Sequence, residues 1–361
     1  MRLSKFTLLL IFSTIILICL CVFQHQSNSH YICSRKVPQL QNKNVSSKLN
    51  IGIVIVLNRN STREDYRIAL DTVECYAKIQ NYQFLYLNET DFDDRCKQPD
   101  YLFRRHCIVA QVLPEFDAIV FLDADIGVVN PNRRIEEFLD DSKDIIFYDR
   151  FFNWEVAMGS YIIRNTKYAK DALMNFSDYN YKLPNCFHGK DNGILQLFLA
   201  EFLFPQSQMQ IENCQKIYNK SKSWDDLFIF QACIRAIMGT STEFGKVRIM
   251  HKGKAWVRDN WLSNSKWNPE TDFMFHAWKM NELEKTPKIV RLVENRYKWY
   301  NPLAGEINLK KCGPNNSTWN YDSRLFEDSH KILGKLEQIE KRIHFDFVKS
   351  ISRMTEILNR K

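Results

Sequence analysis

The sequence lacks the short motifs that mark several common classes of enzyme. It has no Cys-x-x-Cys pair and no His-Glu-x-x-His run, so neither a cysteine zinc site nor a zincin protease is indicated. The nearest approach to a phosphate-binding loop, residues 239–247, has the wrong spacing and no Ser or Thr after Lys246. Internal repeats are absent too.

Concentrated charge of one sign is also missing. The formal net charge is +8, but the basic residues are spread along the chain without an arginine-rich block, so a nucleic-acid partner is not indicated. A mildly basic protein would still suit anionic phosphate ligands. With 361 residues and 45% hydrophobic content, the chain is expected to form one domain of catalytic size with appendages.

Long apolar runs are scarce: there is one, over residues 6–23. As a helix it would reach roughly 27 Å, close to the hydrocarbon thickness of a bilayer. Arg2 and Lys5 precede it, which places residues 1–5 in the cytoplasm and the chain after Phe23 in the lumen. The alternative is a cleaved signal peptide, but the run is longer than the usual apolar region and no small-x-small cleavage site follows. We therefore expect a transmembrane signal-anchor, and hence a single-pass type II Golgi membrane protein.

Sequons and cysteines point to the same compartment. Asparagine is followed two residues later by Ser or Thr at Asn44, Asn60, Asn88, Asn175, Asn219, Asn315 and Asn316. Beyond the apolar run the cysteines form an even set: Cys33, Cys75, Cys96, Cys107, Cys186, Cys214, Cys233 and Cys312. We expect a glycoprotein with disulfide bonds, whose pairing the spacing leaves open.

The remaining chain divides into a stem, a domain and a tail. Residues 24–49 are polar and lack apolar periodicity, as expected of a stem. Strands are predicted over 51–57, 82–87 and 118–122, with helices over about 63–79 and 101–113 between them. Further strands over 144–148 and 159–164 and helices over 168–175 and 193–202 complete a doubly wound, Rossmann-like α/β domain over 50–322.

The last segment, 323–361, has an amphipathic pattern. Apolar residues recur at helical spacing among Lys, Arg and Glu: Ile332, Leu336, Ile339, Ile343, Phe347, Ile351, Met354 and Leu358. We expect a helical tail that packs on the domain or on a second copy of the chain rather than on a membrane. Whether the protein forms a homodimer stays open.

Two carboxylates one residue apart, Asp123 and Asp125, directly follow the apolar strand 118–122. Ligands of α/β sheets bind beyond the carboxyl ends of the strands. Grouped carboxylates repel one another unless a cation neutralises them, and such oxygen ligands suit Mn²⁺ or Mg²⁺, which can bridge phosphate oxygens. A turn or capping role is the alternative. After the pair, Asn130 and Pro131 are expected to open a helix.

At this point the sequence resembles a known family. The string FLDADIGVVNP from Phe121, preceded by FRRHC from Phe103, is similar to a nematode-expanded domain family of unknown function that is distantly similar to galactosyl- and mannosyltransferases of the GT-A fold. The strings HGKDNGILQLF from His188, HKGKAWVRDNW from His251 and FHAWK from Phe275 support it, so the resemblance covers roughly residues 50–300. It implies a GT-A-type mixed sheet and a nucleotide-diphospho-sugar transferase activity.

The resemblance also implies a metal set. Asp125 corresponds to the carboxylate that binds the metal most directly, and Asp123 to the one that contacts the ribose or the metal. His276 matches a C-terminal histidine that serves as a further metal ligand. An ordinary half-buried histidine is the alternative for His276, and His251 is the rival ligand.

Donor contacts follow from the same comparison. Lys279 stands where retaining relatives place a lysine on the leaving diphosphate, with a solvated surface lysine as the alternative. One of Arg104 and Arg105 is expected to face the donor and the other the solvent. The backbone around Gly159 is expected near donor or acceptor, since a glycine allows close approach.

The remaining assignments concern the sugar. Asp191 and Asn192 resemble an acidic-amide pair in which the acid binds donor hydroxyls and the amide lies beneath the anomeric carbon; the alternative for Asp191 is a helix cap. Asn stands where relatives often have Gln. Aromatic residues that could stack on sugars are Trp256, Trp261, Trp267 and Trp278, although tryptophan is mostly a core residue.

Together these features predict a Mn²⁺- or Mg²⁺-dependent hexosyltransferase. It would move a hexose from a nucleotide diphosphate sugar, expected to be UDP-linked, to a hydroxyl of a glycan or glycoprotein, with retention of configuration. Two alternatives stay open: a luminal metal-dependent hydrolase of sugar or phosphate esters, and a non-catalytic glycan-binding pseudoenzyme.

The apolar run yields the first testable prediction. Because no cleavage site follows it, the full-length protein should resist carbonate extraction from membranes and carry glycans beyond residue 40. The measurement is fractionation followed by glycosidase digestion and N-terminal sequencing. A mature secreted form that begins near Ser27 would contradict it.

Overall fold

The computed structural model describes residues 49–314 and 319–360. The predicted apolar span 6–23 and stem 24–48 lie outside them, as do Asn44, Asn315, Asn316 and Cys33. In the part that is described, no helix is both long and apolar enough to cross a membrane.

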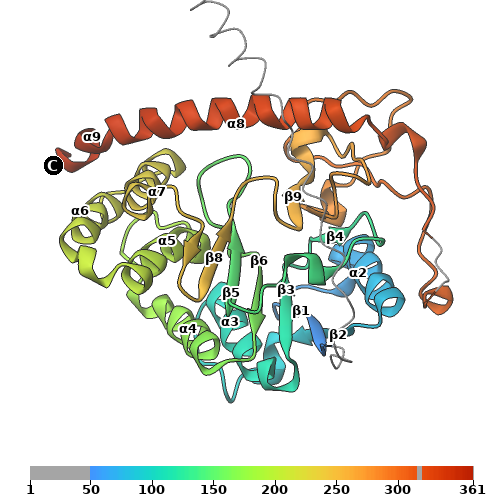
Figure 1. The fold of residues 1–361 in the computed structure, drawn as a ribbon, viewed down its shortest axis with the longest axis horizontal. Coiled ribbons are helices and arrows are strands. Elements are labelled where there is room, and N and C mark those ends of the chain that lie inside the picture. The colour runs from blue at the N-terminus through green and yellow to red at the C-terminus, as the bar shows by residue number, and fades with distance from the viewer. Residues whose placement is uncertain (1–48, 315–318, 361) are drawn as a thin grey trace, which may run out of the picture. The chain divides into compact units, whose positions relative to one another are not determined.

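A seven-stranded mixed sheet forms the centre of the domain (Figure 1). Its strands, in the order in which they pair, are β2 (Gln83–Asn88), β1 (Ile51–Leu57), β3 (Ala118–Leu122), β6 (Ser160–Arg164), β5 (Ile145–Tyr148), β8 (Val247–Met250) and β7 (Glu243–Phe244). The first three strands are parallel, and β6 runs antiparallel to both of its neighbours. The prediction of a mixed α/β domain is confirmed.

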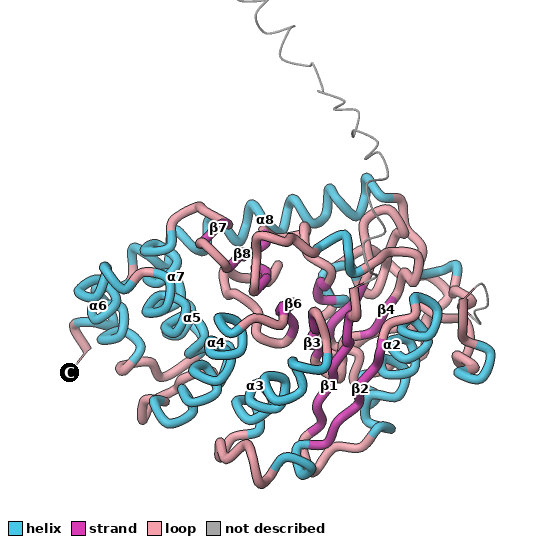
Figure 2. Tube along the Cα trace, turned by 60° about the horizontal axis from the view of Figure 1, so that its bottom comes forward, coloured by secondary structure: helices cyan, strands magenta, loops and turns pink. Residues whose placement is uncertain are grey.

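β1 shows why the sequence folds this way. All seven of its residues are buried, because successive side chains point to opposite faces and both faces are covered. Val54 and Val56 pack in a core with the helices α3 (Tyr101–Val112), α4 (Lys167–Ser177), α5 (Lys190–Leu203), α6 (Gln208–Tyr218) and α7 (Trp224–Met238). Ile53 and Ile55 pack on the other face with α2 (Arg67–Gln80). Figure 2 shows β1, β2 and β3 between α3 and α2.

A second, three-stranded sheet lies beside the first. It contains β4 (Gly127–Val128), β10 (Met274–His276) and β9 (Val257–Asp259), with β10 antiparallel to β4 and parallel to β9. It joins the segment that directly follows β3 to strands that come about 130 to 150 residues later. This pairing brings the FLDADIG and FHAWK strings together.

One local prediction is wrong: no helix opens at Asn130 and Pro131. The Asn130 side chain forms a turn by accepting the N–H of Asn132 (3.1 Å) and donates to the carbonyl of Pro269 (2.9 Å). The chain then forms only a short 3₁₀ turn, Ile135–Phe138. Asn130 is therefore occupied in tying this turn to the loop before β10.

The C-terminal tail packs on the domain, which is one of the two arrangements expected from the sequence, the other being packing on a second copy of the chain. α8 (Ser329–Ser352) buries Ile332, Leu336, Ile339 and Ile343 against a cluster that includes Trp154, Ala232 and Leu262, and α9 (Met354–Leu358) follows. In Figure 1, α8 is the long red helix that runs alongside α7 and β9. The amphipathic spacing of the sequence predicted this buried face.

Three disulfides occur among the described cysteines: Cys75–Cys312, Cys96–Cys107 and Cys214–Cys233. The first ties α2 to a segment 237 residues later. Cys186 is unpaired in this part of the chain. The prediction of disulfide bonds is confirmed for these six cysteines.

The buried face of α8 makes a stability prediction possible. Ile339 is 1% exposed, so Ile339→Ala should lower the free energy of unfolding by about 2–4 kcal/mol through lost apolar burial and a residual cavity. Gln338→Ala, at the exposed neighbouring position, is the matched control and should change it by less than about 0.5 kcal/mol. Denaturant unfolding measures both. Equal stability of the two variants would show that α8 is not part of the cooperative fold.

Candidate functional site

The two carboxylates of the DAD string lie where β3 ends. The backbone N–H of Asp123 donates to the carbonyl of Gly159 (2.8 Å), and that of Ile126 donates back to Asp123 (2.9 Å), so the chain turns tightly there. Asp125 is 6% exposed. The parallel strands β1 and β3 both end at this edge, which is the expected position of a ligand site in an α/β sheet.

The FHAWK string is held against this turn by its backbone. The N–H of Trp278 donates to the carbonyl of Asp125 (2.9 Å). The Asn260 amide donates to the carbonyls of His276 and Ala277, both at 2.9 Å, where Ala277 has a φ of +75°. The ring of Trp278 stacks on Trp299 and fills the space over Gly127, where an added Cβ would lie 2.1 Å from the indole.

Asp123, Asp125 and His276 come together as predicted. Each offers one ligand atom, and these atoms lie within 4.8 Å of one another. His276 Nε2 is 3.5 Å from Asp125 Oδ1. Two carboxylates and an imidazole are a donor set that suits Mn²⁺ and accepts Mg²⁺. His251, the rival ligand, is exposed and is not part of this group.

Arg105 connects the DAD turn to α5. Its guanidinium, buried on α3, bonds the carboxylates of Asp123 and Asp191, the latter at 2.5 Å. Burial raises the pKa of Asp123, the opposing charge of Arg105 lowers it, and the nearby Asp125 raises it further, with a net rise. Of the two arginines, Arg105 is the one that faces the site.

Arg104 lies outside the site. Its guanidinium pairs with Glu89 (3.1 Å) and Asp93 (2.8 Å), and Nε donates to the carbonyl of Gln98 (2.8 Å). Its side chain is 12% exposed, so it does not face solvent freely as the sequence suggested for the second arginine. The structure leaves no contact between Arg104 and the two DAD carboxylates.

Asp191 and Asn192 lie in the first turn of α5. Gly189 holds the N-cap position, so Asp191 is not the cap residue; its Oδ1 accepts the N–H of Asn192 (2.8 Å) while Oδ2 accepts from Arg105. Asn192 Oδ1 accepts the N–H of Met158 (2.9 Å). The amide oxygen is therefore occupied, and the NH₂ group is the part of Asn192 that can serve a ligand.

A small cavity of about 60 Å³ adjoins these groups. It is lined by Asp123, Gly159, Asn192, Asp259 and His276 among others. Lys279, roughly half exposed, places Nζ 4.0 Å from Asp125 Oδ2. A larger hollow of about 700 Å³ shares Phe151, Val257 and Arg258 with the cavity and has α8 as one wall.

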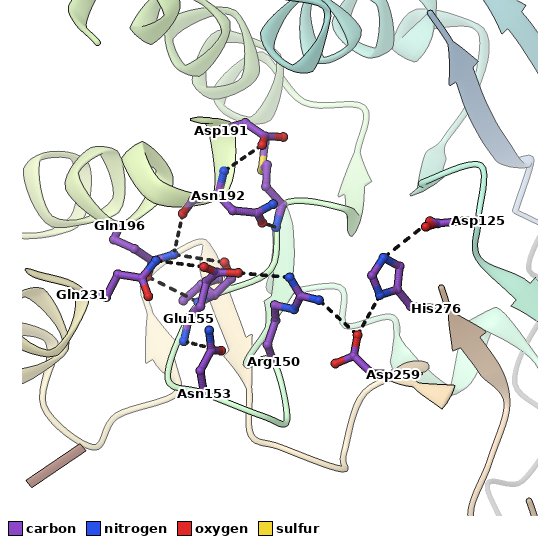
Figure 3. Close-up of polar contacts among 12 residues, drawn as sticks. Asp125, Arg150, Asn153, Glu155, Asp191, Asn192, Gln196, Gln231, Asp259 and His276 are labelled. Atoms are coloured by element: carbon purple, nitrogen blue, oxygen red, sulfur yellow. Dashed lines mark hydrogen bonds and ion pairs between the residues drawn. The ribbon is translucent and has the colours of Figure 1, made fainter. Parts of the chain in front are cut away.

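Sequence reasoning missed two residues. Oδ1 of Asp259 on β9 lies 2.7 Å from Nδ1 of His276, and Arg150 donates to the same Asp259 oxygen at 3.1 Å (Figure 3). Burial lowers the pKa of His276, but Asp125 and Asp259 raise it more. Asp259 lies within the HKGKAWVRDNW string, yet the string alone does not say which of its polar residues faces His276.

The four tryptophans considered for sugar stacking are core residues. Trp256, Trp261, Trp267 and Trp278 are each at most 8% exposed. Trp256 donates its indole N–H to Ser160 (2.8 Å), and Trp267 packs with Tyr321 and Phe326. Packing accounts for their presence.

Comparison with known families identifies the chain. Residues 73–292, more than half of it, match the family described as "Protein of unknown function, DUF273". The chain belongs to this DUF273 family. No curated protein matches it.

Several solved structures resemble the DUF273 chain in part. A glycosyltransferase involved in glycosylation of the major capsid of PBCV-1 is 21% identical, with 43% of this chain and 77% of that one covered and a TM-score of 0.34. The glycosyltransferase GlyE of Streptococcus pneumoniae TIGR4 is 14% identical, with 42% and 43% covered and a TM-score of 0.30. The galactosyltransferase LgtC, solved with donor and acceptor sugar analogs, is 14% identical, with 36% and 64% covered and a TM-score of 0.26.

Gly159 yields a prediction for this site. A Cβ added there would lie 2.5 Å from Asp123 Oδ2, so Gly159→Ala should displace that carboxylate and weaken Mn²⁺ binding roughly tenfold. Gly334→Ala is the matched control, because a Cβ at Gly334 meets nothing within 4 Å. Electron paramagnetic resonance of free Mn²⁺ measures both affinities. Equal affinities in the two variants would contradict the prediction that Asp123 is a ligand held in place by the space at Gly159.

Proposed function

We propose that this DUF273 protein is a metal-dependent glycosyltransferase that moves a hexose from a nucleotide diphosphate sugar to a hydroxyl of a glycan or glycoprotein. The donor is UDP-linked, the metal is Mn²⁺ or Mg²⁺, and the reaction retains the anomeric configuration. The observation that carries the proposal is the meeting of Asp123, Asp125 and His276 at one edge of the sheet, from segments about 150 residues apart.

The charges at this edge support a cation and an anionic ligand. Asp123 and Asp125 repel one another, and Arg105 is shared with Asp191, so it offsets the charge only in part. A divalent cation there would bridge the diphosphate and stabilise its charge as it leaves. Lys279 is exposed enough to turn from Asp125 to that diphosphate and add positive charge.

The acid and the amide of α5 have separate roles in this proposal. Asp191, buried and held by Arg105 through Oδ2, is the group that we assign to the donor hydroxyls. Asn192 keeps its oxygen on the Met158 N–H, so its NH₂ group is the part that would donate a hydrogen bond to the donor sugar.

The acceptor approaches from the larger hollow. The hollow meets the small cavity at Phe151, Val257 and Arg258, so a glycan lying in the hollow would reach the sugar-binding side of the site. Its opposite wall is α8, where Leu333 is 51% exposed beside Glu337 and Glu340. A surface that mixes apolar and carboxylate groups suits the apolar faces and hydroxyls of sugars.

The Golgi location is part of the proposal. Three disulfides are compatible with an oxidising compartment, and Asn60, Asn175 and Asn219 are exposed and open to glycan addition. The N-terminal apolar run would supply the membrane anchor.

The test removes one carboxylate of the metal group. Asp125→Asn should abolish most Mn²⁺-dependent binding of UDP, a loss of roughly 100-fold, because a neutral amide is a poor ligand for the cation that binds the diphosphate. His276→Ala should weaken the binding less, as one neutral ligand among oxygens. Calorimetry with UDP and Mn²⁺ measures both on the full-length protein.

Asp94→Asn serves as the matched control, since the Asp94 side chain is 76% exposed and, among residues 49–314 and 319–360, its carboxylate pairs with the neighbouring Arg95 alone. It should bind UDP as the wild type does. If Asp125→Asn binds UDP with unchanged affinity and without metal, the metal assignment is wrong and the DAD string has only a structural role in a turn. Incubation of the wild type with UDP-hexoses separates the alternatives: donor cleavage that no acceptor alters indicates a hydrolase, and absence of metal-dependent donor binding indicates a pseudoenzyme.

A further inference from the structure

We infer that Asp259 is a positioning residue that holds the imidazole of His276 with Nε2 directed at the metal position. The inference rests on the proposed function, because it concerns the same site. It assigns a role to a side chain that neither binds the metal in the proposal nor touches the sugar.

The register of the second sheet places the two residues side by side. His276 and Asp259 are direct partners in the parallel pairing of β10 with β9. Asp259 Oδ1 lies 2.7 Å from His276 Nδ1, and the opposite ring nitrogen, Nε2, lies 3.5 Å from Asp125 Oδ1. Because a metal-binding nitrogen must carry no proton, a carboxylate on Nδ1 keeps the proton there and leaves Nε2 free.

Asp259 is itself fixed. Its Oδ1 accepts from Arg150 Nη2 at 3.1 Å as well as from His276, and the residue is 4% exposed. With two donors on this oxygen, Asp259 is better placed to orient His276 than to bind a metal through the same atom.

Arg150 is anchored in turn by the core. Its Nη1 lies 3.3 Å from Glu155 Oε1, and Glu155 Oε2 accepts from Gln231 of α7 at 2.9 Å. The N–H of Glu155 also donates to Asn153 Oδ1 (3.1 Å). Figure 3 shows this chain running from Gln231 through Glu155, Arg150 and Asp259 to His276. Each member thus limits the movement of the next, and the chain ends on the ring that faces Asp125.

Two measurements test the inference on the purified full-length protein. The first is the tautomer of His276, read from nitrogen NMR of ¹⁵N-histidine protein without metal at alkaline pH, with His276→Ala identifying the signals. The wild type should show Nδ1 protonated, and Asp259→Ala should show both tautomers. The second is Mn²⁺ affinity from paramagnetic resonance, which Asp259→Ala should lower by about 10- to 100-fold.

Asp259→Asn separates positioning from folding. Its amide oxygen can still accept the Nδ1 proton, so the tautomer should stay as in the wild type while Mn²⁺ affinity falls by about three- to tenfold, because a neutral partner makes His276 a weaker ligand. The matched control is Asp149→Asn. Asp149 is also buried and pairs with Arg235 at 3.1 Å, but it does not bond His276. It should leave both readouts unchanged.

Several outcomes would overturn the inference. The first is a wild-type His276 that is protonated at Nε2. The second is an Asp259→Ala variant in which both the tautomer and the Mn²⁺ affinity are unchanged. If Asp259→Ala does not fold, an unchanged Mn²⁺ affinity in Asp259→Asn takes its place. Failure of the proposed function is distinguishable, because it would appear as wild-type protein that binds UDP without metal. The tautomer measured in metal-free protein does not depend on that result.

Discussion

The repulsion between two carboxylates at the end of β3 is the constraint around which the site is organised. Asp123 and Asp125 lie one residue apart at a largely buried strand end, where like charges are poorly screened. Three neighbouring side chains offset the negative charge of this pair: Arg105 from α3, His276 from β10 and Lys279 just beyond β10. Even the lack of a side chain at Gly159 contributes, since it leaves space for Asp123. An added divalent cation would complete this balance.

Elements with a strong local signal could be predicted closely. β1 and β3 were bounded to the residue, because each is a short apolar run buried on both faces, and the tail helix followed from its apolar spacing. The prediction of a helix at Asn130 and Pro131 was wrong, because the same pair of residues also suits a turn when the Asn130 side chain donates to the carbonyl of Pro269. β9 and β10, of three residues each, have no local signal and exist through pairing with a distant segment.

The residues of the candidate site likewise divide into those that the sequence could predict and those that it could not. Motif resemblance predicted Asp123, Asp125 and His276 as one group, and the structure brings them together. It could not choose between Arg104 and Arg105, because neighbours on a helix point about 100° apart and only packing decides which one faces the site. Asp259 could not be found at all, since its role depends on the register between β9 and β10.

The buried charge pairs around the cavity are better explained by function than by stability. Arg105 with Asp191, and Arg150 with Asp259 and Glu155, are ion pairs whose desolvation offsets much of their attraction, so well-packed apolar residues could fill the same space at little or no loss. Yet Arg150 and Asp259 line one small cavity, and Arg105 bonds Asp123, which lines the same cavity. Both sets therefore end at residues of the candidate metal group. Their placement is what a site requires if it must hold several charged groups in fixed positions before an anionic ligand arrives.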